Sequence, residues 1–406
     1  MRNPSSPRRV LWLCYGGMLC LAVGVNLTPI YFTTFSETFG GPSGLTTEQL
    51  GRISACAFAC LVAGIVISGP LSDRWGAKWF VLLGLASTAA GLAVLASANS
   101  YAMLLAGAGV MGLGAGALDM VLSPIVSALQ TERRASSMNW LHSFYCLGAV
   151  GTVMTGSAAL YLGIPWRAVA VALMALPLAV FIGFAGSNLP PLVHESATRQ
   201  RVRHLTRQPH FLAALAAIFL AGASEAGMAQ WLPAYAEYGL GYSKAASGAA
   251  LAGFSIGMVL GRVSAASIER HFDPYSMMIV CCVLSTVLFV AGCFCPYPPV
   301  ALAACIAVGL TGSCLWPTTL AVNADRFPHG GGSMFALLAA MGNAGCLAMP
   351  WVVGIVAELG AMNWGLATAT LCPASMAFIL WWMKRTVRPA MNDISCSSSG
   401  YADDKT

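Results

Sequence analysis

Long apolar segments alternate with short polar connections along almost the whole chain, and this alternation leaves few possible folds. A helix needs about 20 mostly apolar residues to cross a bilayer. Twelve segments meet this requirement, near residues 10–32, 49–71, 79–98, 101–123, 137–161, 165–187, 210–236, 247–267, 275–295, 298–321, 333–356 and 361–383. Of all residues 57% are hydrophobic and only 9% charged, whereas a soluble domain carries about 25% charge. The sequence therefore predicts an all-α polytopic membrane protein that is solvated by the lipid bilayer.

The positions of Lys and Arg predict its orientation, because positive residues concentrate in cytoplasmic loops. If the N-terminus is cytoplasmic, 18 of the 21 Lys and Arg residues fall on its side, and Arg52, Arg167 and Lys244 fall on the other. An even number of spans with both termini inside explains this distribution. We expect a multi-pass protein of the plasma (inner) membrane. The net charge of +6 lies mainly in short loops and does not indicate nucleic-acid binding.

The chain divides into two halves at its longest polar connection, which holds Arg199, Arg201, Arg203 and Arg207. The predicted order is a cytoplasmic N-terminus (1–9), an N-terminal six-helix half (10–187), a cytoplasmic basic linker (188–209), a C-terminal six-helix half (210–386) and a disordered cytoplasmic tail (387–406). Short motifs recur at similar offsets in the two halves: Pro29-x-Tyr31 as Pro233-x-Tyr235, and Gly112-Leu113 as Gly309-Leu310. Such repeats predict pseudo-symmetric halves with a binding site between them.

A charged stretch follows the second segment, and residues 69–78 read Gly-Pro-Leu-Ser-Asp-Arg-Trp-Gly-Ala-Lys. We expect Gly69 to allow close approach of a neighbouring helix and Gly76 to permit a tight reversal. The stretch resembles the loop motif between helices two and three of the major facilitator superfamily, Gly-x-x-x-Asp-Arg-x-Gly followed by basic residues. Ala77 departs from that motif and Lys78 matches it. The resemblance implies a secondary transporter that works by alternating access between two six-helix halves.

The same stretch contains candidate gating residues. An acid near the membrane is costly unless a cation or a helix N-terminus receives it. We expect Asp73 to meet the helix that begins near Ser333 and to latch the two halves together at the cytoplasmic end. The alternative is that these charges only set topology. The predicted gating set is Gly69, Asp73, Arg74, Gly76 and Lys78, with Arg262, Glu269 and Arg270 in the second half.

Two acids and one histidine well inside predicted spans are candidate proton carriers, because burying a charge there is expensive. Asp119 and Glu225 lie within the fourth and seventh spans, and His142 lies in the fifth. An unpaired carboxylate at such a depth favours its protonated form, and it can take up and release a proton as water enters and leaves. We predict proton coupling through Asp119, Glu225 and His142, with an Asp119–His142 pair as one arrangement. The alternative is that each is a structural group bonded to a neighbouring helix.

Polar and aromatic residues near the middle of the spans are candidates for solute binding. Such groups suit a hydroxylated solute, because amides and acids bond hydroxyls while an aromatic ring covers an apolar face. Trp231 and Tyr235 are equally compatible with interfacial anchors, and the others with packing between helices. The predicted set is Asn26, Tyr31, Asn139, Tyr145, Gln230, Trp231, Tyr235, Trp316, Asn323 and Asn343.

Two of these stretches resemble a narrower family, the fucose–galactose–proton symporters. Residues 119–124 and 139–144 are similar to that family's helix-4 acid and helix-5 asparagine. The resemblance implies a proton-coupling role for Asp119 and a monosaccharide as the solute. Ser123-Pro124 departs from the family's Asn-Pro, and the first span has no acid near Asn26.

These features together predict a proton-coupled transporter of a small polar solute. We expect a monomer that is not an enzyme and that uses no cofactor and no metal. A proton-driven efflux antiporter is one alternative, although such antiporters usually carry an Arg in helix 4 and Gly-Pro in helix 5, and this helix 5 reads Gly148-Ala149-Val150-Gly151. A membrane sensor with this fold that does not transport is the other alternative.

Overall fold

The computed structural model describes residues 6–129, 134–187, 189, 205–268, 272–327 and 331–386. Most of the predicted linker, the predicted tail, Glu269 and Arg270 lie outside these residues, as do the side chains of Asp73, Arg74 and Asn139. The described residues form helices and no strand. The N-terminal helices are α1 (Pro7–Asn26), η1 (Thr28–Tyr31), α2 (Phe32–Phe39), η2 (Gly41–Ser43), α3 (Thr47–Trp75), α4 (Ala77–Ala96), α5 (Tyr101–Leu129), α6 (Arg134–Tyr161), α7 (Trp166–Leu173) and α8 (Ala175–Ala185).

The C-terminal helices are α10 (Pro209–Ala234), η3 (Tyr235–Gly239), α11 (Lys244–Ile268), α12 (Pro274–Phe294), α13 (Pro298–Gly312), α14 (Leu315–Arg326), α15 (Gly331–Leu359), α16 (Met362–Ala367), η4 (Thr368–Thr370) and α17 (Leu371–Thr386). In the described part of the chain, twelve helical spans are long and apolar enough to cross a membrane. Each overlaps one predicted segment, so the predicted all-α fold with its spans is confirmed.

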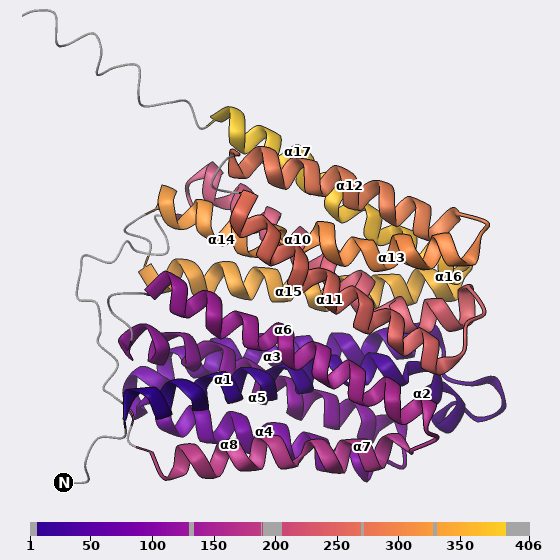
Figure 1. The fold of residues 1–406 in the computed structure, drawn as a ribbon, viewed down its shortest axis with the longest axis horizontal. Coiled ribbons are helices and arrows are strands. Elements are labelled where there is room, and N and C mark those ends of the chain that lie inside the picture. The colour runs from indigo at the N-terminus through magenta and orange to yellow at the C-terminus, as the bar shows by residue number, and fades with distance from the viewer. Residues whose placement is uncertain are drawn as a thin grey trace, which may run out of the picture.

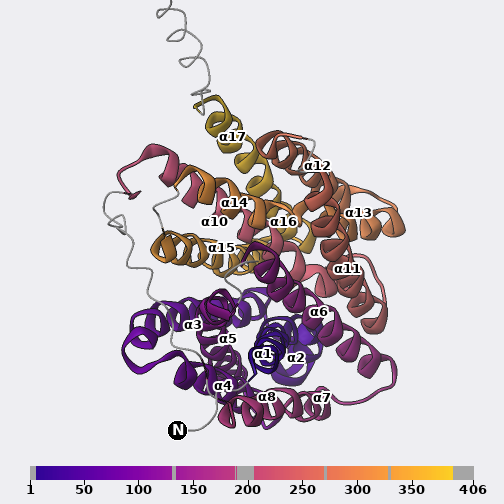
Figure 2. The ribbon, with the colours of Figure 1, turned by 60° about the vertical axis from the view of Figure 1, so that its left-hand side comes forward.

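The helices run side by side in two bundles (Figure 1). One bundle holds α1 to α8 and the other holds α10 to α17, and Figure 2 shows them stacked against each other. The start of α1 and the end of α17 lie at the same end of the molecule, at the left of Figure 1. We call this end the terminal face and the other end the opposite face.

Equivalent glycines bring helices together in both halves. A Cβ on Gly112 of α5 would lie 2.1 Å from the carbonyl oxygen of Ala57 on α3, and one on Gly309 of α13 would lie 2.3 Å from that of Phe254 on α11. Both members of the second pair stand 197 positions after those of the first (309 against 112, 254 against 57). Only glycine allows backbones this close. The two halves therefore repeat a helix crossing as well as a sequence motif.

The first and seventh spans lose regular α-helix at equivalent places. A 3-10 turn at Thr28–Tyr31 separates α1 from α2, and a π turn at Tyr235–Gly239 follows α10. Pro29 and Pro233 lie at these breaks, because proline cannot donate the backbone hydrogen bond that continues a helix. The motif shared by the two halves therefore marks the same structural feature.

The charged stretch at residues 69–78 differs in part from its prediction. Most of it is helix rather than loop, because α3 continues to Trp75. Gly76 makes the reversal alone, with a φ of 85° that side chains with a Cβ rarely adopt. A Cβ on Gly69 would lie 3.5 Å from the methyl group of Met120, which is an ordinary contact. The expected close approach at Gly69 is therefore wrong.

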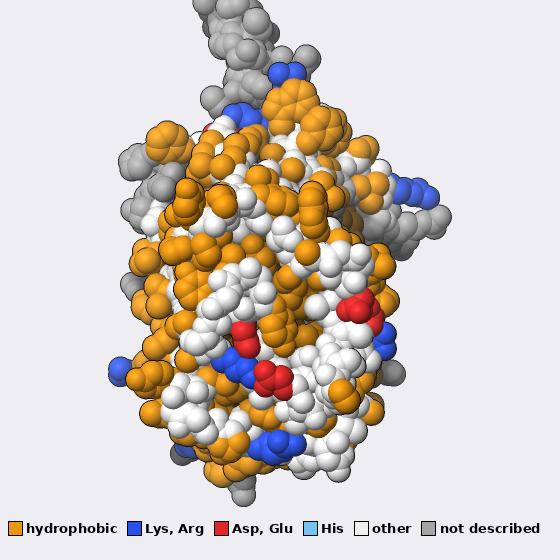
Figure 3. Space-filling view, turned by 90° about the vertical axis from the view of Figure 1, so that its right-hand side faces the viewer, with side chains coloured by type: hydrophobic (Ala, Val, Ile, Leu, Met, Phe, Trp, Pro, Cys, Tyr) orange, Lys and Arg blue, Asp and Glu red, His pale blue; other side chains and the backbone are white. Residues whose placement is uncertain are grey.

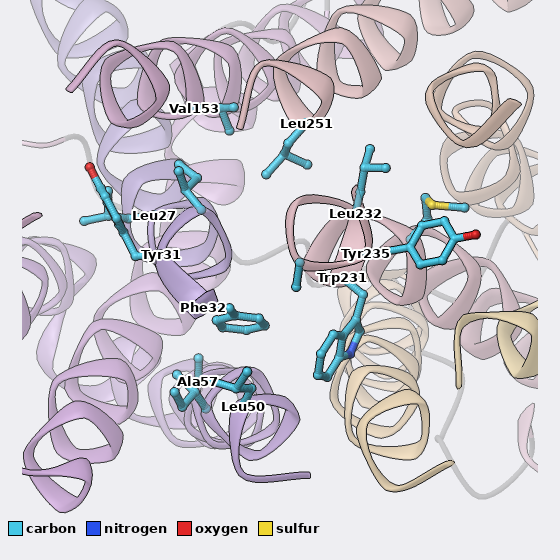
Figure 4. Close-up of a cluster of buried hydrophobic side chains, with 14 of the residues drawn as sticks. Leu27, Tyr31, Phe32, Leu50, Ala57, Val153, Trp231, Leu232, Tyr235 and Leu251 are labelled. Carbon is cyan, nitrogen blue, oxygen red and sulfur yellow. The ribbon is translucent and has the colours of Figure 1, made fainter. Parts of the chain in front are cut away.

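An apolar layer joins the two halves near the opposite face (Figure 4). Trp231 and Phe32 form its centre, with ring centroids 5.6 Å apart and both side chains fully buried. We call this layer the closing layer, and its members are Leu27, Phe32, Leu50, Val153, Trp231, Leu232 and Leu251. Residues of α10 and α11 here contact residues of α3 and α6, so burial of apolar surface holds the halves together at this end.

Two glycines let helices of different halves cross closely beside this layer. A Cβ on Gly51 of α3 would lie 2.7 Å from the carbonyl oxygen of Pro350, and one on Gly354 of α15 would lie 2.6 Å from that of Thr47. Trp231 contacts both sites, and its indole N–H donates to the Pro350 carbonyl over 2.8 Å. The crossing of α3 and α15 therefore depends on two glycines and one indole.

Hydrogen bonds and an ion pair connect the halves at the opposite face, where acidic and basic side chains gather (Figure 3). The backbone N–H and the hydroxyl of Thr47 each donate to Glu358, both over 2.9 Å. The Trp351 indole donates to Glu48 over 2.7 Å. Lys244 forms an ion pair with Glu37. The molecule is therefore closed at this face by apolar packing and by charges.

Candidate functional site

A charged pair lies inside the C-terminal half. Glu225 of α10 and Arg262 of α11 approach to 3.7 Å between carboxylate and guanidinium, and 23% and 25% of their side-chain surfaces are accessible. Both residues belong to helices long and apolar enough to span a membrane. Charges at such a depth are costly, and residues that retain them mark transport pathways in many membrane proteins. The pair is therefore the first element of a candidate site.

Arg262 also connects the two halves. Its Nη1 donates to the sulfur of Cys146 on α6 over 2.7 Å, and its Nε donates to the Ser313 carbonyl over 3.4 Å. Ser313 follows the last residue of α13, where helix carbonyls lack partners within their own helix. The interruption between α13 and α14 thus supplies an acceptor. Arg262 is held by neutral groups of both halves in addition to Glu225.

A second polar contact lies between α1 and α6. The Asn26 amide donates to the Tyr145 hydroxyl over 3.4 Å and to the Ala22 carbonyl over 2.9 Å. Tyr145 precedes Cys146 in the chain and lies within electrostatic range of Glu225. The polar residues of α1 and α6 are therefore close to the charged pair. We call the set Asn26, His142, Tyr145, Cys146, Glu225 and Arg262 the polar cluster.

The two remaining ionisable residues predicted for coupling have different surroundings. His142 is one helical turn from Cys146, is exposed, and lies within electrostatic range of Arg262. Asp119 of α5 is partly exposed and makes no hydrogen bond or ion pair with any described residue, His142 included. The structure thus brings His142 toward Arg262, and the Asp119–His142 pair stays a hypothesis without a contact to support it.

Several predicted solute-binding residues instead lie in or beside the closing layer. Trp231 is fully buried there, and the Gln230 side chain accepts from the Ser54 hydroxyl across the halves over 2.6 Å. The Tyr31 hydroxyl donates to the Gly156 carbonyl over 3.3 Å, and that of Tyr235 donates to the Gly292 carbonyl over 2.8 Å. In this conformation these groups are satisfied by protein partners.

The predicted residues of α14 and α15 make local contacts. Asn323 is fully buried and donates to the Thr319 carbonyl over 2.7 Å. Asn343 donates to the Ala339 carbonyl over 3.0 Å. The Trp316 ring fills the space that a Cβ on Gly342 would need, with a nearest approach of 2.3 Å. The two asparagines therefore bond to carbonyls of their own helices, and Trp316 packs α14 against α15.

The predicted gating residues separate into different locations. Lys78 donates to the carbonyls of Ala185 and Ser187 over 2.9 and 2.7 Å, so it binds the end of α8 within its own half. Arg262, which the sequence grouped with the charges of the cytoplasmic end, is the partner of Glu225. The remaining charged members lie outside the described side chains.

Sequence reasoning did not predict the partners that connect the halves. It missed Cys146 as an acceptor for Arg262, and it missed Thr47 and Glu358 at the opposite face. One signal was available for the second contact, since Thr47 begins a span and helix N-termini favour nearby carboxylates. The thiol contact had no such signal, because cysteines inside apolar runs are most often small core residues.

The arrangement of two six-helix halves, with polar groups between them, agrees with the family comparison. The model of the Major Facilitator Superfamily matches residues 13–312 and 240–395. The chain belongs to this superfamily. The resemblance of residues 69–78 to the superfamily's motif is thereby confirmed, and the molecule is a transporter-family protein rather than an enzyme.

The individual relatives and solved structures that match this chain have low sequence identity to it. An uncharacterized MFS-type transporter of Yersinia pestis is 22% identical over 325 residues, which cover 79% of this chain and 83% of the relative. The MFS-type efflux transporter ffsH of Aspergillus flavipes is 27% identical over 153 residues, 34% of this chain and 27% of the relative. The E. coli fucose:proton symporter FucP has a TM-score of 0.64 at 20% identity, covering 93% of this chain and 99% of the other. The structural likeness supports the fold alone.

Proposed function

We propose that this superfamily member is a proton-coupled symporter of a small polar solute of about monosaccharide size. The observation that carries the proposal is the Glu225–Arg262 pair, which is partly accessible within spanning helices and lies beside groups of the other half. A charged pair with accessible surface at this depth can receive both a proton and a polar solute.

The proposed coupling uses the two states of Glu225. While ionised, the carboxylate attracts Arg262 and stabilises the present arrangement of α10 and α11. Protonation removes this attraction, so Arg262 becomes available to the solute and the halves can rearrange around it. Asp119 and His142 are the remaining proposed proton sites, since Asp119 lacks a described partner and His142 is close to Arg262.

In the proposed cycle the present conformation is closed at the opposite face and exchanges solute at the terminal face. The predominance of Lys and Arg on the side of the termini supports a cytoplasmic terminal face in a plasma (inner) membrane. Asp73, Arg74 and Lys78, with Glu269 and Arg270, are the proposed gating charges at that face. The protein acts as a monomer in this proposal, because one chain supplies both halves.

Flux measurements in proteoliposomes test the proposal. The purified full-length protein is reconstituted, and a pH-sensitive dye and labelled solutes follow a panel of small polar compounds. We expect one class of solute to enter together with protons, and Glu225→Gln to exchange solute without moving protons. Asp119→Asn is expected to lower the proton flux, whereas Asp273→Asn serves as a control acid at the terminal face, away from the interface between the halves.

Two outcomes contradict the symport proposal. Protons that move against the solute would indicate an efflux antiporter, a function that the name of the Aspergillus relative also suggests. Wild-type protein that binds solutes without any flux would favour a sensor. Unchanged proton flux in both Glu225→Gln and Asp119→Asn would retain a carrier but reject the proposed coupling residues.

A further inference from the structure

Arg262 has more bonding capacity than its protein partners use. A guanidinium carries five N–H donors and a permanent charge. Its distance of 3.7 Å to Glu225 is longer than a hydrogen bond, and its closest contacts are the neutral thiol of Cys146 and the neutral carbonyl of Ser313. A quarter of its side chain is accessible. The positive charge is therefore fixed in place but only loosely compensated.

This arrangement has a consequence when Glu225 is protonated. The contacts to Cys146 and Ser313 do not depend on the charge of Glu225, so Arg262 stays where it is and loses its only described counter-charge. An unpaired charge inside a membrane protein is strongly unfavourable. A neutral solute cannot remove this penalty, whereas a solute with one negative charge can.

We propose that the transported solute is a hydroxylated monocarboxylate, such as a sugar acid, whose carboxylate binds Arg262 in place of Glu225. This inference rests on the proposed symport and narrows its solute class. Arg262 suits a carboxylate because its planar N–H groups match the two carboxylate oxygens. The Tyr145 hydroxyl and the Asn26 amide, joined by a long bond of 3.4 Å, are available for the hydroxyl groups of the same solute.

The charges of the site balance in this arrangement. The titratable groups that face the Glu225–Arg262 pair are His142, Tyr145 and Cys146 of α6 and Cys346 of α15. Without solute, Arg262 and ionised Glu225 sum to zero. With one proton on Glu225 and one monocarboxylate on Arg262, the sum is again zero. Each cycle therefore carries one proton and one anion, and transport is electroneutral.

Paired solutes separate this inference from the general symport proposal. Proteoliposomes with the full-length protein are offered glucose, gluconate, galactose and galactonate, with the membrane potential set by potassium and valinomycin. We expect uptake of an acid but not of its neutral partner, driven by a pH gradient and unaffected by the potential. Proton-coupled uptake of a neutral sugar would overturn the anion inference and leave symport standing. Absence of proton coupling for every solute would instead overturn the proposed function.

Binding measurements give a second readout that needs no transport. In wild-type protein the dissociation constant of the acid should tighten about tenfold per pH unit as the pH falls, over the range in which Glu225 is ionised in the free protein, because there one proton binds with each anion. Glu225→Gln should bind the acid with little pH dependence. Arg262→Gln should lose binding, and Arg262→Lys should recover part of it. Arg385→Gln, an exposed arginine at the end of α17, is the control. Equal binding by Arg262→Gln and wild type would overturn the inference.

Discussion

The closing layer and the polar cluster both connect the two halves, but they do so by opposite physical means. In the closing layer Trp231, Phe32 and Leu50 are buried to within 1% of full burial. In the polar cluster Glu225 and Arg262 keep about a quarter of their side-chain surface accessible. The first contact gains from excluding water, and the second is useful only if protons and solute reach it. One interface therefore combines a dry contact with a contact that can change its partners.

Two predicted site residues on one helix have different roles for the same reason. Trp231 and Glu225 lie on the same helix, less than two turns apart, and both were predicted to act on the solute or the proton. Trp231 donates its N–H to a backbone carbonyl and fills a glycine-lined crossing, whereas the charge of Glu225 has a loosely held partner. The surroundings of each side chain, together with its charge, decide which one is free to act.

Breaking the charged pair is expected to have the largest effect on transport. Arg262→Gln should abolish proton-driven uptake and should destabilise the protein by about 1–3 kcal/mol, less than the 3–5 kcal/mol of a fully buried pair because the pair is partly accessible. The double variant Glu225→Gln/Arg262→Gln should recover the melting temperature but not transport. Thermal unfolding in detergent and uptake in proteoliposomes measure the two effects. A double variant that transports like wild type would remove the pair from the mechanism.

Truncating the centre of the closing layer comes next. Trp231→Ala should lower the free energy of unfolding by about 3–5 kcal/mol, because a large aromatic side chain leaves a cavity. It should also make a cysteine introduced at Leu50 react with a thiol reagent added from the opposite face. Trp231→Phe keeps most of the volume but loses the bond to the Pro350 carbonyl, so it should show a smaller change in both measurements. Equal reactivity in all three proteins would argue against a closing role.

A smaller change tests the close crossing of α3 and α15. Gly354→Val should push the helices apart, because even a Cβ would lie 2.6 Å from the Thr47 carbonyl oxygen. We expect a twofold to tenfold faster reaction of the same Leu50→Cys reporter, with about 1–3 kcal/mol lost through overpacking. Gly360→Val is the matched control, since a Cβ there meets nothing closer than 3.7 Å. If both valine variants behave alike, the crossing is not what keeps this face closed.

The Asp273 cap of α12 lies away from both regions, and its contribution to the free energy of unfolding is expected to be the smallest of those considered. Asp273 caps α12, accepting from the N–H and hydroxyl of Ser276 over 2.9 and 2.8 Å, and lies 3.0 Å from Lys384. Asp273→Ala should cost about 1 kcal/mol, as removal of a cap does, and should leave transport unchanged. Asp273→Asn should retain most of the stability, because asparagine also caps helices. Thermal unfolding measures both.

The pH dependence of this contact has a definite sign. Partial burial acts to raise the pKa of Asp273, but the bonds from Ser276 and the Lys384 ammonium outweigh it and hold the pKa below its ordinary value. Its stabilisation is therefore present above the unfolded pKa of about 3.9 and is lost as the pH falls through the lower folded value. The difference in melting temperature between wild type and Asp273→Ala should shrink over that range. A difference that grows on acidification would contradict the assignment.

Apolar length and short repeated motifs were enough to predict the number of spans, their approximate ends and the division into two related halves. Apolar length is a local property, and the cost of placing polar residues in lipid is set residue by residue. Short motifs likewise indicate local backbone features, because proline and glycine act on the backbone at their own positions. The irregular turns lie beside Pro29 and Pro233, and the close helix crossings lie at Gly112 and Gly309.

Which polar residues meet depends on the packing of helices that are far apart in the chain. Arg262 was grouped with the charges of one end, yet it pairs with Glu225 and Cys146. Trp231 was a solute candidate, yet it closes the opposite face. These partners depend on how each helix is rotated about its axis. Spans such as α10 are apolar on nearly every side, so the sequence gives little indication of which face turns inward. Contacts between helices far apart in the chain fix that rotation, and with it the candidate site.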